Sequence, residues 1–417
     1  MFAPSPSTYD LPDVWYLAAD GMFRFGSLSV TDGRIASVRP AGPPLPRPPP
    51  DAPWWAPAGV DPHVHFREPG AAASEGVANG SRAARAGGVA WVCDMPNNVP
   101  PVLTAEDLRA KAARFRRDCP LRFALFLDAR GDAPLEPPAC GYKLFLTDVA
   151  CTRTAIAPLL RGRKRVTVHA EDAARFRSGP ALPHHRRRPI RAVTAALLAL
   201  EDAYFSLPER DRPVLVLAHA TGRPEMAFAW RMRRKGARLF VETAPHYLLF
   251  TARDQCAAGA ALKVNPPLRS GADRIALWHA IQEGDIDFFG SDHAPHLPEA
   301  KSSADPPSGM PGVEWFLPLA YTFAAAGFLP FRRVMELTSL AARRAYGLPA
   351  SEGIAPGSPA DLARMVPAAY ATLPAARVPL RLSARPGTPV RPVVSRAGYN
   401  PYRDFPFAWF VDDLRIS

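Results

Sequence analysis

The sequence predicts an α/β fold, a TIM-type (β/α)8 barrel joined to a small β-sandwich domain that both ends of the chain build. Short apolar, β-rich runs alternate with helical stretches between Pro57 and about Gly347, which is typical of parallel βα units. About eight such units in fewer than 300 residues suit a closed barrel. Before and after this region the pattern contains strands without helices. We therefore expect a composite β domain from residues 1–56 and 350–417, and a barrel from residues 57–349.

The individual elements follow from local pattern. Strands are expected first at 14–19, 23–30 and 35–40, with a turn at 31–34, and the proline-rich stretch 41–53 predicts an extended surface loop or linker. Barrel strands are expected at 89–95, 121–129, 141–147, 165–170, 213–220, 237–244 and 286–294. Helices are expected at 81–88, 105–117, 194–205, 225–236 and 274–284. Strands expected at 379–384, 388–397 and 407–416 return the chain to the β domain.

The composition argues against several classes of protein. The 417 residues are 47% hydrophobic, yet no run of about 18 apolar residues predicts a membrane-spanning helix, and the N-terminus lacks the pattern of a secretory signal. The five cysteines are scattered without a CxxC pair, which favours a reducing cytoplasm over a disulfide framework. The net charge of +12 comes mainly from dispersed arginines without interleaved aromatic residues, so we expect solvated surfaces rather than nucleic-acid binding. A positive field would still attract an anionic substrate.

Several histidines stand where metal ligands would be expected. His63 and His65 are separated by one residue on a predicted strand, so both side chains point to the same side and can bind one metal ion. His169 and His219 each end an apolar run, and Asp292 follows another. In a barrel these strand ends face the mouth that carries the site. Each histidine alone could be a core residue, but four imidazoles and a carboxylate together suit two divalent metal ions, with zinc the leading choice.

Two adjacent cations require an anion between them, and two residues are candidates. Lys143 lies inside an apolar strand, in a chain that has only six lysines. A buried lysine loses its proton readily, and the neutral amine can take up carbon dioxide to form a bridging carbamate. Asp148 is the rival bridge. Asp292 could bind a metal and also carry a proton to the leaving nitrogen, or it could cap a helix.

At this point the ordered motifs resemble a known family. DPHVHFREPG, DMPNNVPP, GYKLFL, VTVHAED, LAHATG, VETAPHYLLF, KVNPPLR, GSDHAPH and GMPGVE are similar to those of the cyclic amidohydrolases of the amidohydrolase superfamily, and to dihydroorotases most of all. The similarity runs from about Gly59 to Glu314. One departure concerns the fourth strand, where many bacterial members have a DDG motif with an Asp ligand. This chain reads KLFLTDVA, which contains both Lys143 and Asp148, so both candidates for the bridge stay open.

The resemblance implies a role for each matched residue. One metal would be bound by His63 and His65 and the other by His169 and His219, with carboxylated Lys143 between them. Asp292 would bind a metal and act as the catalytic acid/base. The substrate carboxylate would be held by Arg67, Asn97 and His296, and Asn265 would contact the substrate ring.

The resemblance implies reversible, metal-dependent hydrolysis of dihydroorotate to N-carbamoyl-aspartate in pyrimidine biosynthesis. An allantoinase or hydantoinase is the nearest alternative, but allantoinase-like sequences tend to have Asn at the position of Arg67, and their substrates lack the carboxylate. A second alternative is a non-catalytic dihydroorotase-like scaffold for a transcarbamoylase, although the ligand set here is complete. A homodimer or a complex with a transcarbamoylase is the partner expectation, with no membrane and no nucleic acid.

Overall fold

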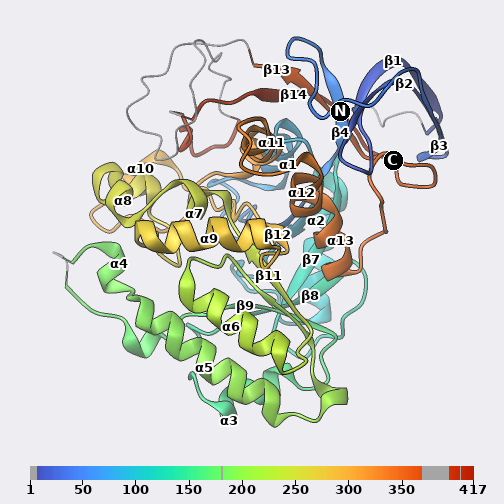
Figure 1. Ribbon diagram of the computed structural model, residues 1–417. Helices are drawn as coiled ribbons and strands as arrows, with labels where there is room; N and C mark the ends of the chain where they lie inside the picture. Colours follow the sequence, from blue (N-terminus) through green and yellow to red (C-terminus); the bar gives the residue numbers. More distant parts are fainter. Residues whose placement is uncertain (1–6, 180–181, 369–393, 404) are drawn as a thin grey trace.

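A barrel of eight parallel strands lies at the centre of the computed structural model, which describes residues 7–179, 182–368, 394–403 and 405–417 (Figure 1). Every paired neighbour in this sheet runs parallel, and an isolated parallel bridge between Val64 and His293 joins its two ends. The predicted TIM barrel is therefore confirmed. In sheet order the strands are β5 (Gly59–Val64), β6 (Val89–Asp94), β7 (Arg122–Asp128), β8 (Ala139–Phe145), β9 (Arg165–His169), β10 (Val214–Leu217), β11 (Leu239–Thr243) and β12 (Phe288–Phe289).

Helices surround the barrel, and local signals set their ends. Thr104 begins the second helix because its hydroxyl accepts the N–H of Asp107 at 3.1 Å while the Asp107 carboxylate accepts the N–H of Thr104 at 2.9 Å. Ser270 and Asp273 form the same kind of capping box at the start of the ninth helix, Gly271–Glu283. The helices are α1 (Val77–Ala86), α2 (Ala105–Asp118), α3 (Arg153–Leu160), α4 (His184–Arg187), α5 (Ile190–Ser206), α6 (Arg223–Arg234), α7 (Pro245–Leu249), α8 (Ala252–Ala258), α9 (Gly271–Glu283), α10 (Pro298–Lys301), α11 (Phe316–Ala325), α12 (Phe331–Met335) and α13 (Ala341–Tyr346).

A second sheet contains strands from both ends of the chain, as predicted for the β domain. Its six strands form one hydrogen-bonded sheet, in which β4 joins the N-terminal strands to the C-terminal ones. In sheet order they are β14 (Trp409–Arg415), β13 (Leu362–Pro367), β4 (Trp54–Pro57), β1 (Tyr9–Leu17), β2 (Phe23–Thr31) and β3 (Arg34–Pro40). The expected strand at 379–384 and most of the one at 388–397 lie outside the described residues. The domain boundaries at 56/57 and 349/350 stay a prediction.

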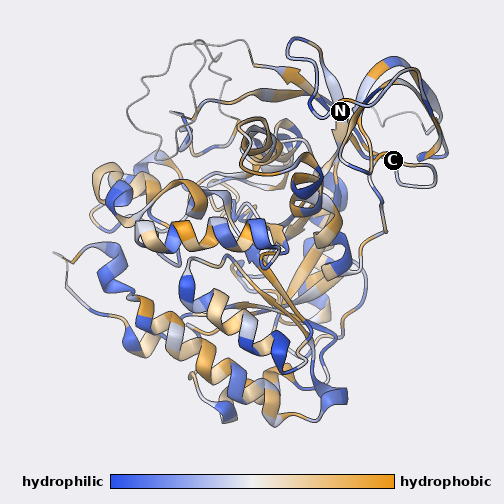
Figure 2. Ribbon diagram, in the orientation of Figure 1, coloured by the Kyte–Doolittle hydropathy of each residue, from blue (hydrophilic) through white to orange (hydrophobic). Residues whose placement is uncertain are grey.

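The apolar residues of the strands form the core between barrel and helices. All six residues of β5 are buried, and Figure 2 shows hydrophobic residues concentrated on the central strands and polar residues on the outer helix faces. Among the described residues, no helix combines the length and the apolar character needed to cross a membrane. All five cysteines are free.

Candidate active site

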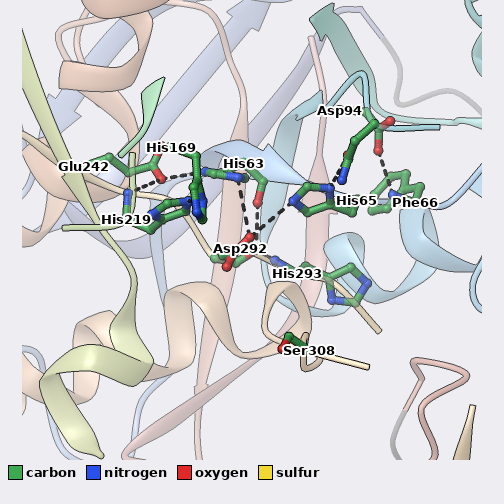
Figure 3. A network of polar contacts seen from close by, with 12 residues as sticks. His63, His65, Phe66, Asp94, His169, His219, Glu242, Asp292, His293 and Ser308 are labelled. Atoms are coloured by element: carbon green, nitrogen blue, oxygen red, sulfur yellow. Dashed lines mark hydrogen bonds and ion pairs between the residues drawn. The ribbon is translucent and has the colours of Figure 1, made fainter. Parts of the chain in front are cut away.

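His63 and His65 lie at the end of β5 with one nitrogen each aimed at Asp292. His63 Nδ1 is 2.7 Å from Glu242 Oε1 (Figure 3), and His65 Nδ1 is 2.8 Å from Asn97 Oδ1. These oxygens accept from both Nδ1 atoms, so in the neutral form of each ring Nε2 has a lone pair. The two Nε2 atoms lie 3.5 and 3.3 Å from Asp292 Oδ1. This buried trio has the donors and spacing of a metal site.

His169 and His219 form the second pair, at the ends of β9 and β10. His169 Nδ1 lies 3.0 Å from His219 Nε2, while His169 Nε2 contacts Glu171 Oε2 at 3.0 Å. The Glu171 carboxylate accepts a hydrogen bond from Nε2–H of His169, so in the neutral ring Nδ1 has the lone pair and accepts from His219 Nε2. The ring centroids of His63 and His219 are 5.2 Å apart, which places the second pair directly beside the first.

A cation fits this arrangement better than the side chains alone do. Ligand atoms of His63, His65 and Asp292 converge in a buried space, and the two imidazole lone pairs and the carboxylate repel one another unless a positive charge lies between them. Carboxylates or an amide oxygen hold the opposite nitrogen of three of the rings, which is the usual support of metal-bound histidine. The donor set therefore fits divalent metal ions.

Lys143 is buried in β8 beside the second histidine pair. Its Nζ has no hydrogen-bond partner among the described residues and lies 5.2 Å from the centroid of the Phe145 ring. Burial lowers the pKa of Lys143 to about 8. Asp148, the rival for the bridging position, is exposed and pairs with Arg130 at 3.4 Å. Asp148 thus lies beyond the end of β8, on the surface, which favours Lys143 over Asp148 as the candidate bridge.

Backbone strain coincides with the site. Among the described residues only five other than glycine have a left-handed φ, and these include Arg67 at 62°, His219 at 36° and Asp292 at 49°. This conformation is unfavourable for side chains that have a Cβ and persists where the surroundings enforce it. Three of the residues predicted for the site are thus held in strained positions.

Sequence similarity to curated proteins shows which family the chain belongs to. No protein-family model matches it. It is 35% identical to a dihydroorotase from Halobacterium salinarum over 75% of this chain and 76% of that one. It is 33% identical to an allantoinase from Rubrobacter xylanophilus over 75% and 74% of the two chains. The chain is a cyclic amidohydrolase. An L-hydantoinase from Arthrobacter aurescens shares the fold, with a TM-score of 0.77 and 20% identity over 98% of this chain and 94% of that one.

In this cyclic amidohydrolase, three of the predicted substrate residues lie near the first histidine pair. Arg67 Nη2 is 3.0 Å from His296 Nε2, and Asn97 contacts His65. His296 Nε2 also lies 3.0 Å from Ser308 O, and one ring nitrogen cannot accept from Arg67 and donate to Ser308 at the same time. Arg67 Nε is buried and has no hydrogen-bond partner among the described residues. The guanidinium therefore has a donor that the described part of the chain does not satisfy.

Asn265 lies elsewhere in the loops of the cyclic amidohydrolase. Its Oδ1 is 3.0 Å from Nε2 of His184 on α4, and its described polar contact is with this histidine rather than with Arg67, Asn97 or His296. Asn265 thus stays a candidate for contact with the substrate ring, and His184 holds its side chain.

Sequence reasoning missed the buried carboxylates that support the histidines. Glu242 Oε1 accepts from His63 and also from the N–H of His219 at 3.0 Å, so one oxygen fixes a member of each pair. Glu171 is paired with Arg188 Nη2 at 2.5 Å. Asp61 Oδ1 accepts the N–H groups of His63 and Ser291 at 3.1 and 3.0 Å. In the sequence each of these acidic residues stands inside or directly after an apolar run, and this is the signal that could have identified them.

Proposed function

We propose that this cyclic amidohydrolase is a dihydroorotase, which opens the ring of dihydroorotate to N-carbamoyl-aspartate and closes it again in pyrimidine biosynthesis. The observation that carries the proposal is the unsatisfied guanidinium of Arg67, close to His296 and to the histidine pair that includes His65. A planar guanidinium is suited to a carboxylate, with which it forms two parallel hydrogen bonds. A ring substrate with a carboxylate beside its scissile amide matches this arrangement.

The proposed metal centre holds two divalent ions, and zinc is preferred because imidazole dominates the ligand set. His63 and His65 would bind one ion, His169 and His219 the other, and Asp292 would complete the first site. A carbamate on Lys143 would bridge the ions, a role supported by its buried amine, which has no hydrogen-bond partner in the described part of the chain. When bound, the ions supply Lewis acidity that activates a water molecule and polarises a carbonyl group.

Asp292 is proposed as the group that moves the proton. Its carboxylate lies within 3.5 Å of the Nε2 atoms of both His63 and His65, and its left-handed backbone aims it at them. The carboxylate would take a proton from the attacking water as the new C–O bond forms. It would then give that proton to the ring nitrogen as the C–N bond breaks. In ring closure the same steps run in reverse.

An allantoinase or hydantoinase is the second candidate, supported by the allantoinase relative at 33% identity. Substrates of those enzymes lack a ring carboxylate, so Arg67 and His296 would have no anion to bind. The partner proposal is a homodimer or a complex with a transcarbamoylase. A purely scaffolding role is disfavoured because four imidazoles, a carboxylate and a buried lysine are all retained.

The deciding experiment compares substrates on one preparation. Purified protein of measured metal content is assayed side by side with dihydroorotate, allantoin and hydantoin. The proposal requires the highest kcat/KM with dihydroorotate. A higher kcat/KM with allantoin or hydantoin would instead assign the chain as an allantoinase or hydantoinase. Full metal occupancy without turnover of any of the three substrates would favour the non-catalytic scaffold.

A further inference from the structure

Lys111 on α2 is a buried lysine whose ammonium group makes one ion pair and two hydrogen bonds. Its Nζ lies 2.5 Å from Asp94 Oδ1, 2.6 Å from Met95 O and 2.8 Å from Asn98 Oδ1. The side chains of Lys111 and Asp94 are 0% and 1% exposed, so water cannot replace these contacts. The ammonium group donates to Met95 O and Asn98 Oδ1, and its charge is paired with the carboxylate of Asp94.

All three acceptors belong to the end of β6 and the loop that follows it. This loop, residues 95–98, carries Asn97, which lies between two residues held by the same ammonium group. Asn97 Oδ1 in turn contacts His65 Nδ1. Loss of the ammonium group would free the loop on both sides of Asn97.

The same ion pair also holds the loop after β5. Asp94 Oδ2 accepts the N–H of Phe66 at 2.7 Å, and the N–H of Met95 donates to Val64 O at 2.9 Å. Phe66 lies between His65 and Arg67, and Arg67 has the left-handed φ of 62°. The Asp94 carboxylate therefore fixes the backbone immediately before the strained residue.

We propose that Lys111 is a positioning residue, which sets the mutual placement of Arg67 and Asn97 and so shapes the site for the substrate carboxylate. Lys111 itself does not reach the substrate, because its ammonium group is enclosed by Asp94, Met95 and Asn98. The inference rests on the proposed dihydroorotase function, since it assigns a purpose to the placement of those two residues.

A merely structural ion pair is the competing explanation, and the chain offers a matched control for it. Arg343 and Asp361 form another buried pair at 2.8 Å, with 3% and 2% of the side chains exposed. Neither residue lies in the loops after β5 or β6. Arg343→Met should lower the unfolding temperature as Lys111→Met does, without changing the carboxylate site.

The experiment uses full-length, metal-loaded protein. For Lys111→Met we expect KM for dihydroorotate to rise about tenfold while kcat changes less than threefold, because small misplacements of binding groups already cost large factors. Binding of orotate, which carries the same carboxylate on an unsaturated ring, is measured by calorimetry and should weaken about as much. Metal content should be unchanged. For Arg343→Met both KM and the orotate Kd should stay within twofold of wild type.

Each outcome decides between the explanations. Unchanged KM and orotate affinity in Lys111→Met, or equal effects in Arg343→Met, would reduce Lys111 to a structural role. If Lys111→Met does not fold, Asn98→Ala removes one of its acceptors and should still raise KM about threefold; no rise would overturn the proposal. If the wild type neither turns over dihydroorotate nor binds orotate, the proposed function itself fails and this inference fails with it.

Discussion

Replacing Arg67 with methionine removes the guanidinium and keeps a side chain of similar reach. The group contacts His296 at 3.0 Å, and its buried Nε has no partner within the described ranges, so a donor is available to a ligand. A charge-assisted hydrogen bond contributes about 1.5–3 kcal/mol. Since about 1.4 kcal/mol corresponds to tenfold, losing one such bond should reduce kcat/KM for dihydroorotate by about 10- to 100-fold.

The assay measures initial rates in both directions with dihydroorotate and N-carbamoyl-aspartate, and with hydantoin as a substrate without a carboxylate. Arg67→Met should affect hydantoin much less, because that ring has no anion to lose. Arg67→Lys should restore activity only in part, since an ammonium group cannot present two parallel donors. Metal content is measured for each variant, because His65 lies two residues away.

Equal losses with both substrates would refute this reasoning. If the unfolding temperature fell at the same time, Arg67 would be a brace of the barrel mouth rather than a carboxylate ligand. A wild-type preference for hydantoin over dihydroorotate would exclude the dihydroorotase assignment, and only the assignment to the cyclic amidohydrolases would remain.

Three further variants test the metal centre. Lys143→Ala should lose at least one metal ion per chain by elemental analysis, and short-chain carboxylic acids should partly restore activity; a variant with full metal and rate would exclude the carbamate bridge. Asp292→Asn should lower kcat by about a hundredfold or more in stopped assays, whereas near-normal turnover would leave Asp292 a structural role. Glu242→Gln, which weakens the acceptor for His63 Nδ1 at 2.7 Å, should reduce metal affinity by about 10- to 100-fold in chelator competition, and unchanged affinity would contradict its supporting role.

The parts of the site that sequence could predict are those set by strand geometry. His63 and His65 alternate with Val64, and period 2 on a strand puts them on one side. His169 ends β9 and His219 follows β10, and parallel strands bring such ends to the same rim. The βα alternation that predicted the barrel depends on the same local periodicities, so it needed no knowledge of distant contacts.

Contacts between distant segments explain what sequence could not predict. Glu242 supports His63 although 179 residues separate them, and nothing near either position indicates the pairing. Lys111 looks like an ordinary basic residue of an amphipathic helix, but its ammonium group is buried against Asp94. Asp148 was a candidate bridge because KLFLTDVA contains an Asp as well as Lys143 where many bacterial members have a DDG motif. However, β8 ends at Phe145, and the chain has reached the surface three residues later.

The C-terminal segment shows that the barrel mouth is not built by barrel residues alone. The N–H groups of Val394 and Ser395 donate to Glu314 Oε2 at 3.1 and 2.9 Å, and the Ser395 hydroxyl donates to Glu75 Oε2 at 3.0 Å. Both carboxylates are buried, and a buried charge without hydrogen bonds is costly. Glu75 Oε1 also lies 3.5 Å from Nε2 of His293, the residue after Asp292. The segment at residues 394–395 therefore donates hydrogen bonds to two buried carboxylates, and Glu75 links this segment to His293, which follows Asp292.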